Sequence, residues 1–170
     1  TLVTASSKLL KSGMKLNKKG DKRYVKFTFG FRKIPVHVAV FSDQHHLSED
    51  VALGETIMSY ANKGDDIIIF DRGLQSRKVL EQLYESEYKF VTRVNPYIRY
   101  DILNEQPLKP NNSDSDGLIL EHDYIVRLYD KKDKPTKGFY RLIITSKDDD
   151  LLYFLSNIKE LEAYEIAHIY

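Results

Sequence analysis

The first part of the chain alternates between hydrophobic and polar positions in two neighbouring segments, residues 24–31 and residues 34–40. A period of two is typical of a strand with one buried face, because successive side chains point to opposite sides. Only a short Arg-Lys connection separates the segments, so the pattern predicts an antiparallel pair. Residues 1–7 can supply an adjoining strand. The apolar side chains of the two segments are Val25, Phe27, Phe29, Phe31, Ile34, Val36, Val38 and Val40.

The following segments alternate between helical and strand-like patterns. Apolar residues recur at helical spacing over residues 47–61, where Ser48 is the expected N-cap, and again over residues 79–84. Residues 67–70, Ile-Ile-Ile-Phe, do not alternate, which is typical of a parallel strand covered on both faces. With a further strand at residues 88–94, this order predicts an α/β fold with helices packed on the faces of a mixed sheet.

The chain changes character from residue 97 onward, where prolines and a polar loop at residues 111–117 separate short strand-like segments. The last apolar residues, which end at Tyr170, have helical spacing but no capping signal, so this helix is expected to be cut in mid-course. The second half is therefore predicted to be rich in β-structure. Its strands are expected near residues 118–129, 139–145 and 151–155.

The composition is that of a folded domain with a hydrophobic core, since 42 % of the residues are hydrophobic and 30 % are charged. No apolar run approaches the roughly 20 residues of a membrane-spanning helix, and no signal-peptide pattern is present. We therefore expect an intracellular protein with no membrane partner. The chain has no cysteine, which excludes disulfides, thiolate zinc sites and a cysteine nucleophile.

Charge is distributed unevenly along the chain, although the formal net charge is only +1. Residues 1–33 carry ten Lys or Arg residues and a single acidic residue, Asp21. Such a segment fits either a solvated surface hairpin or an electrostatic footprint for a polyanion, and composition alone favours the hairpin. The lysines nevertheless recur without neutralising acids, as contacts to phosphates require.

Asp71 directly follows the apolar run at residues 67–70 and precedes Arg72 and Gly73. In open α/β sheets, ligands bind beyond the carboxyl ends of the parallel strands, which makes Asp71 a candidate functional residue. The alternative is an aspartate that accepts backbone N–H bonds in a turn, with Gly73 supplying a backbone angle that other residues avoid. The chain contains no P-loop, dinucleotide fingerprint or nucleophile elbow.

Two adjacent histidines, His45 and His46, lie among carboxylates and raise the question of a metal site. Adjacent histidines in a loop point in different directions, and their spacing matches no HExxH-type helix. The nearby acids suit the positive start of a helix. Helix capping is therefore the better interpretation of this cluster.

Taken in order, the segments resemble the DDE-class transposases of bacterial insertion sequences, in the branch with a β-rich insertion in the catalytic domain. The stretch "IIIFDRGLQSRKVLEQL" is similar to the family's second catalytic aspartate, which closes an apolar strand and is followed by Arg-Gly and a helix. The stretch "YKFVTRVN" is similar to the next strand, which typically ends in an arginine. After the insertion come "FYRLIITS", "LLYFLSNI" and "EAYEIAHIY", whose final Tyr170 matches the first member of the family's Tyr-Arg-Glu-Lys signature.

The resemblance runs nearly end to end and implies an α/β, ribonuclease-H-like mixed sheet with flanking helices, interrupted by a β-rich insertion. Residues 1–96 would be part of the catalytic core, residues 97–156 the insertion, and residues 157–170 the start of the returning core helix. The family's first aspartate would precede Thr1, and its catalytic glutamate would follow Tyr170. The chain is then a fragment that holds one of three catalytic acids and is expected to be inactive alone.

The resemblance also implies the function: metal-dependent DNA strand cleavage and strand transfer, with Mg²⁺ or Mn²⁺ as cofactor in the full-length enzyme. Asp71 would be the catalytic residue and the metal ligand. The partners would be transposon-end and target DNA, with a homodimer assembled on DNA in the full-length protein, in the bacterial cytoplasm and nucleoid. The residues expected to contact DNA are Arg72, Arg77, Arg93, Lys18, Lys19, Lys22, Arg23 and Tyr170.

Other interpretations of these residues stay open. The arginines near Asp71 can instead form ion pairs with Glu81, Glu85 or Asp71 itself. A metal-dependent nuclease of the same fold fits the sequence too, as does a non-catalytic DNA-binding module in which the basic hairpin acts and Asp71 is vestigial. Exposed tyrosines can stack on bases, although core packing is their commoner use. The tyrosines considered are Tyr97, Tyr100, Tyr124 and Tyr129.

Overall fold

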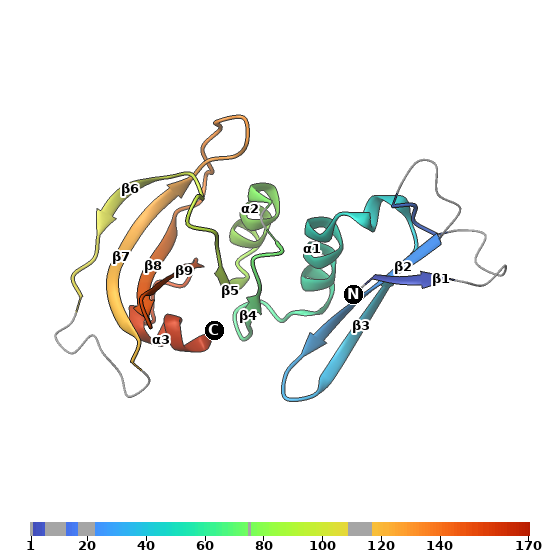
Figure 1. The fold of residues 1–170 in the computed structure, drawn as a ribbon, viewed down its shortest axis with the longest axis horizontal. Coiled ribbons are helices and arrows are strands. Elements are labelled where there is room, and N and C mark those ends of the chain that lie inside the picture. The colour runs from blue at the N-terminus through green and yellow to red at the C-terminus, as the bar shows by residue number, and fades with distance from the viewer. Residues whose placement is uncertain (1, 6–12, 17–22, 75, 109–116) are drawn as a thin grey trace. The chain divides into compact units, whose positions relative to one another are not determined.

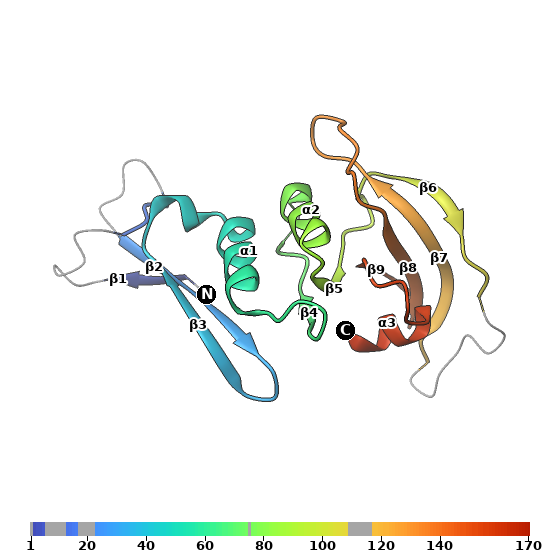
Figure 2. The same cartoon turned by 180° about the vertical axis from the view of Figure 1, so that it is seen from behind.

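The structure is a computed structural model that describes residues 2–5, 13–16, 23–74, 76–108 and 117–170. The chain divides into two compact units, residues 1–61 and residues 62–170. Figure 1 labels the helices and strands of both units, and Figure 2 gives the view from behind. None of the helices among the described residues is long and apolar enough to cross a membrane.

The first unit contains a three-stranded antiparallel sheet in the order β1-β2-β3. Phe27 of β2 pairs with Val40 of β3, and Phe29 pairs with Val38, so the predicted antiparallel pair is confirmed. A 3₁₀-helix, η1 (Gln44–Leu47), leads into helix α1. The elements are β1 (Leu2–Ala5), β2 (Arg23–Phe31), β3 (Pro35–Phe41) and α1 (Glu49–Tyr60).

The apolar face of this sheet is largely exposed, which contradicts the expected burial. The exposed fraction of Phe31 is 65 %, and Phe29 is also exposed. Contacts with α1 come from the opposite face, where the Tyr60 ring stacks on His37 at a centroid distance of 5.0 Å. A Cβ atom at Gly30 would lie only 2.9 Å from Tyr60, so this glycine allows the close approach. The alternation therefore predicted the strands correctly but not the face that the helix covers.

The second unit contains a six-stranded sheet in the order β4-β5-β9-β8-β7-β6. Strands β4 and β5 are parallel and every other pair in this sheet is antiparallel, so a mixed sheet in an α/β fold is confirmed. The prediction that the first strands of the chain belong to the same sheet is wrong, because β1, β2 and β3 form a separate three-stranded sheet. The elements are β4 (Ile67–Phe70), α2 (Arg77–Glu85), β5 (Lys89–Arg93), β6 (Tyr100–Glu105), β7 (Ile119–Leu128), β8 (Tyr140–Lys147), β9 (Asp150–Ser156) and α3 (Ala163–Ile169).

Helices α2 and α3 cover opposite faces of this sheet. On one face, Tyr84 of α2 and Phe90 of β5 both contact the ring of Tyr140. On the other face, the buried residues of α3 join one hydrophobic core with Val91 and with residues of β7, β8 and β9. The members of that core are Val91, Leu118, Leu120, Ile143, Phe154, Ile158, Ala163, Ile166 and Ala167.

Strand β4 is not covered on both faces, contrary to the prediction from its unbroken apolar run. Phe70 is buried, but the exposed fraction of Ile69 is 51 % and that of Ile67 is 38 %. The reason is the position of β4 at the edge of the six-stranded sheet, where no described element of the second unit covers the face of Ile67 and Ile69.

The strands of the second half continue the same sheet as the parallel pair, because β9 pairs with β5. The assignment of residues 97–156 as an insertion and of residues 1–96 and 157–170 as core stays a prediction. Strand pairing alone does not distinguish an inserted strand from an original one. Strand β6 has no counterpart in the sequence prediction.

Candidate active site at the carboxyl ends of the parallel strands

Asp71 lies immediately beyond the carboxyl end of β4, and its side chain is exposed. The neighbouring parallel strand β5 ends at Arg93, and Phe70 pairs with Thr92 in the register of these two strands. Because parallel strands end at the same edge of a sheet, Asp71 and Arg93 lie close together at that edge, which is called the rim below. The position of Asp71 is therefore the one at which α/β sheets bind ligands.

The backbone after Asp71 forms a turn in which Leu74 N–H donates to the Asp71 carbonyl at 3.3 Å. Within it, Arg72 N–H donates to Asp71 Oδ1 at 2.7 Å, as the alternative interpretation of this aspartate expected. Gly73 does not adopt a positive φ, so the expectation that it supplies an unusual backbone angle is wrong. The turn does not need a left-handed residue at position 73, because the Asp71 side chain accepts the Arg72 N–H and so stabilises an ordinary turn.

Tyr170 completes the rim from the other end of the described chain. Its Oη donates a hydrogen bond to Asp71 Oδ1 at 3.0 Å, across a sequence separation of 99 residues. Its ring lies 5.7 Å from the ring of Phe154, and the Arg93 guanidinium carbon lies 5.8 Å from the Tyr170 ring centre. Two residues that the sequence assigned to a DNA-processing site, Asp71 and Tyr170, are thus in direct contact, with Arg93 beside them.

The hydrogen bonds and charges at this rim shift the pKa values of Asp71 and Tyr170 in opposite directions. The Arg72 N–H, the Tyr170 hydroxyl and, more weakly, the guanidinium groups of Arg72 and Arg93 lower the pKa of Asp71. Partial burial, the hydrogen bond to Asp71 and its negative charge raise the pKa of Tyr170. At neutral pH the rim therefore presents an ionised carboxylate, a neutral phenol and two cations.

The rim can supply one ligand to a divalent cation. Mg²⁺ takes one or two carboxylates and keeps several waters, so the exposed, ionised Asp71 fits as a single ligand. Among the described residues, no three His, Cys, Asp or Glu side chains are grouped so that they could hold a metal ion. The residues described here thus fit part of a metal site, and the cofactor expectation stays a prediction.

Arg77 and Arg72 differ in their surroundings. Arg72 is exposed next to Asp71, whereas Arg77 begins α2 and its Nε donates to the Tyr129 carbonyl at 3.3 Å. Of the glutamates suggested as ion-pair partners for the arginines, Glu81 accepts a hydrogen bond from the Lys137 N–H, and Glu85 accepts one from the Lys137 Nζ at 2.8 Å.

The predicted basic contacts near the N-terminus belong to the first unit. Arg23 begins β2, is half-buried, and its Nη1 donates to the Gly13 carbonyl at 3.4 Å. Lys18, Lys19 and Lys22 lie outside the described residues. Their assignment as DNA contacts stays a prediction.

The tyrosines proposed for base stacking occupy different environments. Tyr97 follows β5 with an exposed fraction of 90 %, and with Arg77 and Asn95 it lines a small pocket of about 180 Å³. Tyr129 instead donates a hydrogen bond to Asp101 at 2.5 Å, and the Tyr124 ring stacks on His122. Tyr97 is therefore the member of this set best placed to meet a ligand.

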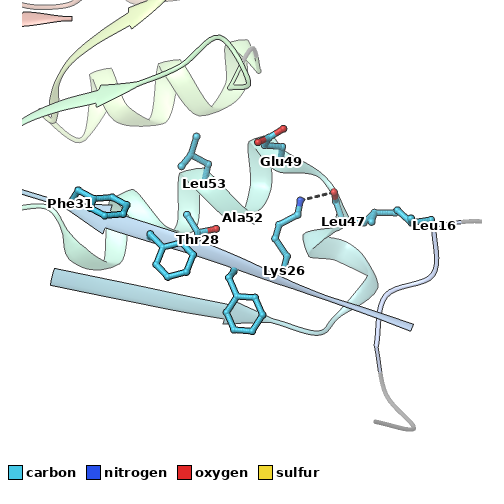
Figure 3. A pocket seen from close by; sticks show the side chains of 10 residues that line it. Leu16, Lys26, Thr28, Phe31, Leu47, Glu49, Ala52 and Leu53 are labelled. Atoms are coloured by element: carbon cyan, nitrogen blue, oxygen red, sulfur yellow. Dashed lines mark hydrogen bonds between the residues drawn. The ribbon is translucent and has the colours of Figure 1, made fainter. Parts of the chain in front are cut away.

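A second concave region lies between β2 and α1 in the first unit, with a volume of about 560 Å³ (Figure 3). Its lining is mainly apolar and includes Phe31 and Leu53. Lys26 also lines it, but its Nζ donates to the Leu47 carbonyl at 2.7 Å, and burial lowers the pKa of this lysine. The groove presents packing surface rather than a group of reactive side chains.

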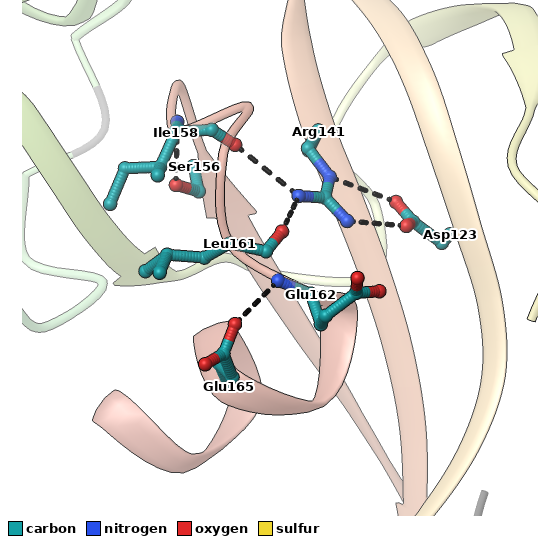
Figure 4. A network of polar contacts seen from close by, with 7 residues as sticks. All are labelled: Asp123, Arg141, Ser156, Ile158, Leu161, Glu162 and Glu165. Carbon is teal, nitrogen blue, oxygen red and sulfur yellow. Dashed lines mark hydrogen bonds and ion pairs between the residues drawn. The ribbon is translucent and has the colours of Figure 1, made fainter. Parts of the chain in front are cut away.

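Sequence reasoning missed one buried polar pair, Asp123 with Arg141 (Figure 4). A signal was present at Arg141, a charged side chain within the apolar segment Phe-Tyr-Arg-Leu-Ile-Ile of residues 139–144, whereas Asp123 directly follows Glu121 and His122 and carried no such signal. Charged side chains are rarely buried unless they are paired, so Arg141 indicated a buried acidic partner without identifying it.

The chain was also compared with known proteins. It matches no model of a protein family and no curated protein sequence.

Proposed function

We propose that this chain is part of the catalytic domain of a DDE-class DNA transposase with a ribonuclease-H-like fold, in which Asp71 is one of three catalytic carboxylates. The observation that carries the proposal is the hydrogen bond from Tyr170 to Asp71. The sequence resemblance assigns both residues to the same function from segments far apart in the chain, and their contact is what a shared active site requires.

The chemistry of the rim supports the same assignment. In two-metal phosphoryl transfer, ions about 4 Å apart stabilise the attacking and leaving oxygens of an in-line displacement. Asp71 is ionised at neutral pH like any exposed aspartate, and its hydrogen bonds and the adjacent arginines lower its pKa further. It would serve as one ligand of such an ion. Arg93 and Arg72 carry planar guanidinium groups that suit phosphate oxygens.

The remaining parts of the proposal follow from the family. The partners are transposon-end and target DNA, the assembled form on DNA is a homodimer, and the full-length protein acts in the bacterial cytoplasm. This chain alone is expected to be inactive, because one carboxylate cannot hold two ions. A metal-dependent nuclease and a non-catalytic DNA-binding module are the rival functions.

A paramagnetic titration tests the metal role of Asp71. Mn²⁺ added to the ¹⁵N-labelled chain should broaden the amide signals of residues 71–73 at millimolar concentration, and Asp71→Asn should abolish this effect. Asp149→Asn is the matched control, because it removes an exposed carboxylate from the β8–β9 turn at a position with φ 66° that asparagine tolerates. Broadening that persists in Asp71→Asn would remove Asp71 as a ligand.

A nicking assay separates the rival enzymes. The proposal expects no cleavage of supercoiled DNA by this chain with Mg²⁺ or Mn²⁺. Metal-dependent nicking that disappears in Asp71→Ala would favour the self-sufficient nuclease instead. DNA binding without any Mn²⁺ effect at Asp71 would favour the non-catalytic module.

A further inference from the structure

The buried ion pair between β7 and β8 has a geometry that reaches beyond the two strands. Arg141 Nε donates to Asp123 Oδ1 at 3.2 Å, and Arg141 Nη2 donates to Asp123 Oδ2 at 2.5 Å. The exposed fractions are only 4 % for Asp123 and 8 % for Arg141. Asp123 thus binds two of the three guanidinium nitrogens and determines the orientation of the third.

That third nitrogen, Nη1, donates to two backbone carbonyls in the segment between β9 and α3. One is the carbonyl of Ile158, at 3.4 Å, and the other is the carbonyl of Leu161 (Figure 4). Leu161 immediately precedes Glu162, the N-cap of α3. The guanidinium of Arg141 therefore connects the sheet to the start of the helix.

The same segment is held to β5 by side chains. Ser156 Oγ donates to the Phe90 carbonyl at 2.8 Å, and Asn157 Nδ2 donates to the Tyr88 carbonyl at 2.8 Å. Phe90 N–H donates in return to Asn157 Oδ1 at 3.0 Å. With its start anchored at these points, α3 has little freedom in position.

Helix α3 in turn determines where Tyr170 lies, because Tyr170 directly follows its last residue, Ile169. A capping box of Glu162 and Glu165 closes its first turn, and Ile166 is fully buried in the core. The helix is short, so an anchor at its start and burial of one face leave a narrow range of positions for the residue that follows it. Tyr170 Oη reaches Asp71 Oδ1 from this position.

Stability alone does not account for a buried pair of this kind. Replacing a buried ion pair with apolar residues of similar volume is often neutral or stabilising, because desolvation offsets the attraction between the charges. Apolar residues would nevertheless lack donors for the carbonyls of Ile158 and Leu161. The property specific to Arg141 is therefore the connection to the α3 segment.

We propose that Asp123 and Arg141 are positioning residues for the candidate site: Asp123 orients Arg141, Arg141 holds the segment before α3, and α3 places the Tyr170 hydroxyl on Asp71. An effect of Asp123 and Arg141 on DNA and metal binding is expected only if the proposed function is correct. The positional effect itself is a property of the free chain.

The test uses the 170-residue chain with ¹³Cζ-labelled tyrosine, observed by NMR without DNA or metal. The chain has 12 tyrosines, and the signal of Tyr170 is assigned from its absence in Tyr170→Phe. Asp71→Ala defines the signal of a Tyr170 that has lost its hydrogen-bond acceptor. Arg141→Met should move the Tyr170 signal at pH 7 to that same position and lower the pKa of Tyr170 to the value in Asp71→Ala.

Two further variants keep the test decisive. Arg99→Met removes an arginine from an exposed pair with Asp133 and should leave the Tyr170 signal unchanged. The double variant Asp123→Leu with Arg141→Met leaves no buried charge unpaired and should keep the amide signals of β7 and β8 while Tyr170 loses its contact. An unchanged Tyr170 signal in a folded variant would overturn the inference.

Loss of the β7 and β8 signals in both the single and the double variant would also overturn the inference, because the ion pair would then be needed to fold the sheet and not to position α3.

This test and the test of the proposed function can fail independently. The Tyr170 signal is read without metal or DNA, so failure of Mn²⁺ broadening at Asp71 leaves this result standing, and the reverse holds too.

Discussion

The guanidinium carbon of Arg93 lies 5.8 Å from the centre of the Tyr170 ring, beside the hydrogen bond from Tyr170 Oη to Asp71 Oδ1. Arg93 comes from the end of β5, Tyr170 follows α3, and Asp71 follows β4. Three separate segments thus place a cation, a phenol and a carboxylate at one rim. Each contact in this arrangement can be removed by a single substitution.

Removing the Tyr170 hydroxyl should raise the pKa of Asp71. In Tyr170→Phe the carboxylate loses one hydrogen bond, but it keeps the Arg72 N–H, which is the larger cause of the lowered pKa. The pKa should therefore rise and still remain below the ordinary aspartate value. A ¹³C-detected titration of the Asp71 carboxyl group measures it, with Tyr97→Phe as the control. A pKa that stays the same in Tyr170→Phe would show that the hydrogen bond is not formed in solution.

The contribution of Tyr170 to stability should depend on pH at the alkaline end. Its pKa in the folded chain is raised above the ordinary value of 10.0, so folding favours the neutral phenol. The stabilisation is fully present below pH 10 and is lost as the pH rises through the higher folded pKa. The free energy of unfolding in urea should differ less between the natural chain and Tyr170→Phe at pH 11.5 than at pH 7. An equal difference at both pH values would contradict this.

At acidic pH, the contribution of Asp71 to stability should depend on pH in the opposite direction. Its pKa in the folded chain is lowered from 3.8, so its contribution is present above that value and is lost as the pH falls through the lower folded pKa. Asp71→Asn should therefore lose stability relative to the natural chain at pH 6 and approach it at pH 2. Because the carboxylate is exposed, the effect should be small.

Arg93 should contribute to DNA affinity through a phosphate contact. In Arg93→Gln, affinity for duplex DNA should fall, and the slope of log affinity against log salt should become shallower by about 1. Fluorescence anisotropy at several salt concentrations measures both quantities. Arg99→Gln, which removes an exposed arginine that is paired with Asp133, is the control. A slope unchanged by Arg93→Gln would exclude a phosphate contact at this residue.

Packing of α3 should be needed for the second unit to stay folded. Ile166 is fully buried, so Ile166→Ala should cost about 2–5 kcal/mol of the free energy of unfolding. Tyr164 lies on the exposed side of the same helix, and Tyr164→Ala should cost about 1 kcal/mol or less. Urea unfolding followed by the signals of β8 and β9 compares the two. Equal costs would mean that α3 does not pack on the sheet in solution.

Several elements were predictable because their signals are local. Residues 79–84 and 88–94 were predicted as helix and strand, and the structure has α2 at Arg77–Glu85 and β5 at Lys89–Arg93. Strand β6 was missed, since its residues are mostly exposed and alternate weakly. Its strand conformation depends on pairing with β7.

The amino-acid sequence by itself determined that Asp71 follows an apolar strand and that helices and strands alternate over residues 47–94. These properties depend on side-chain period and on adjacency in the chain. Only the tertiary structure decided that β9 pairs with β5, that β4 is the edge strand of the six-stranded sheet, and that Tyr170 contacts Asp71. Those relationships depend on packing between segments far apart in the sequence, which no local pattern encodes.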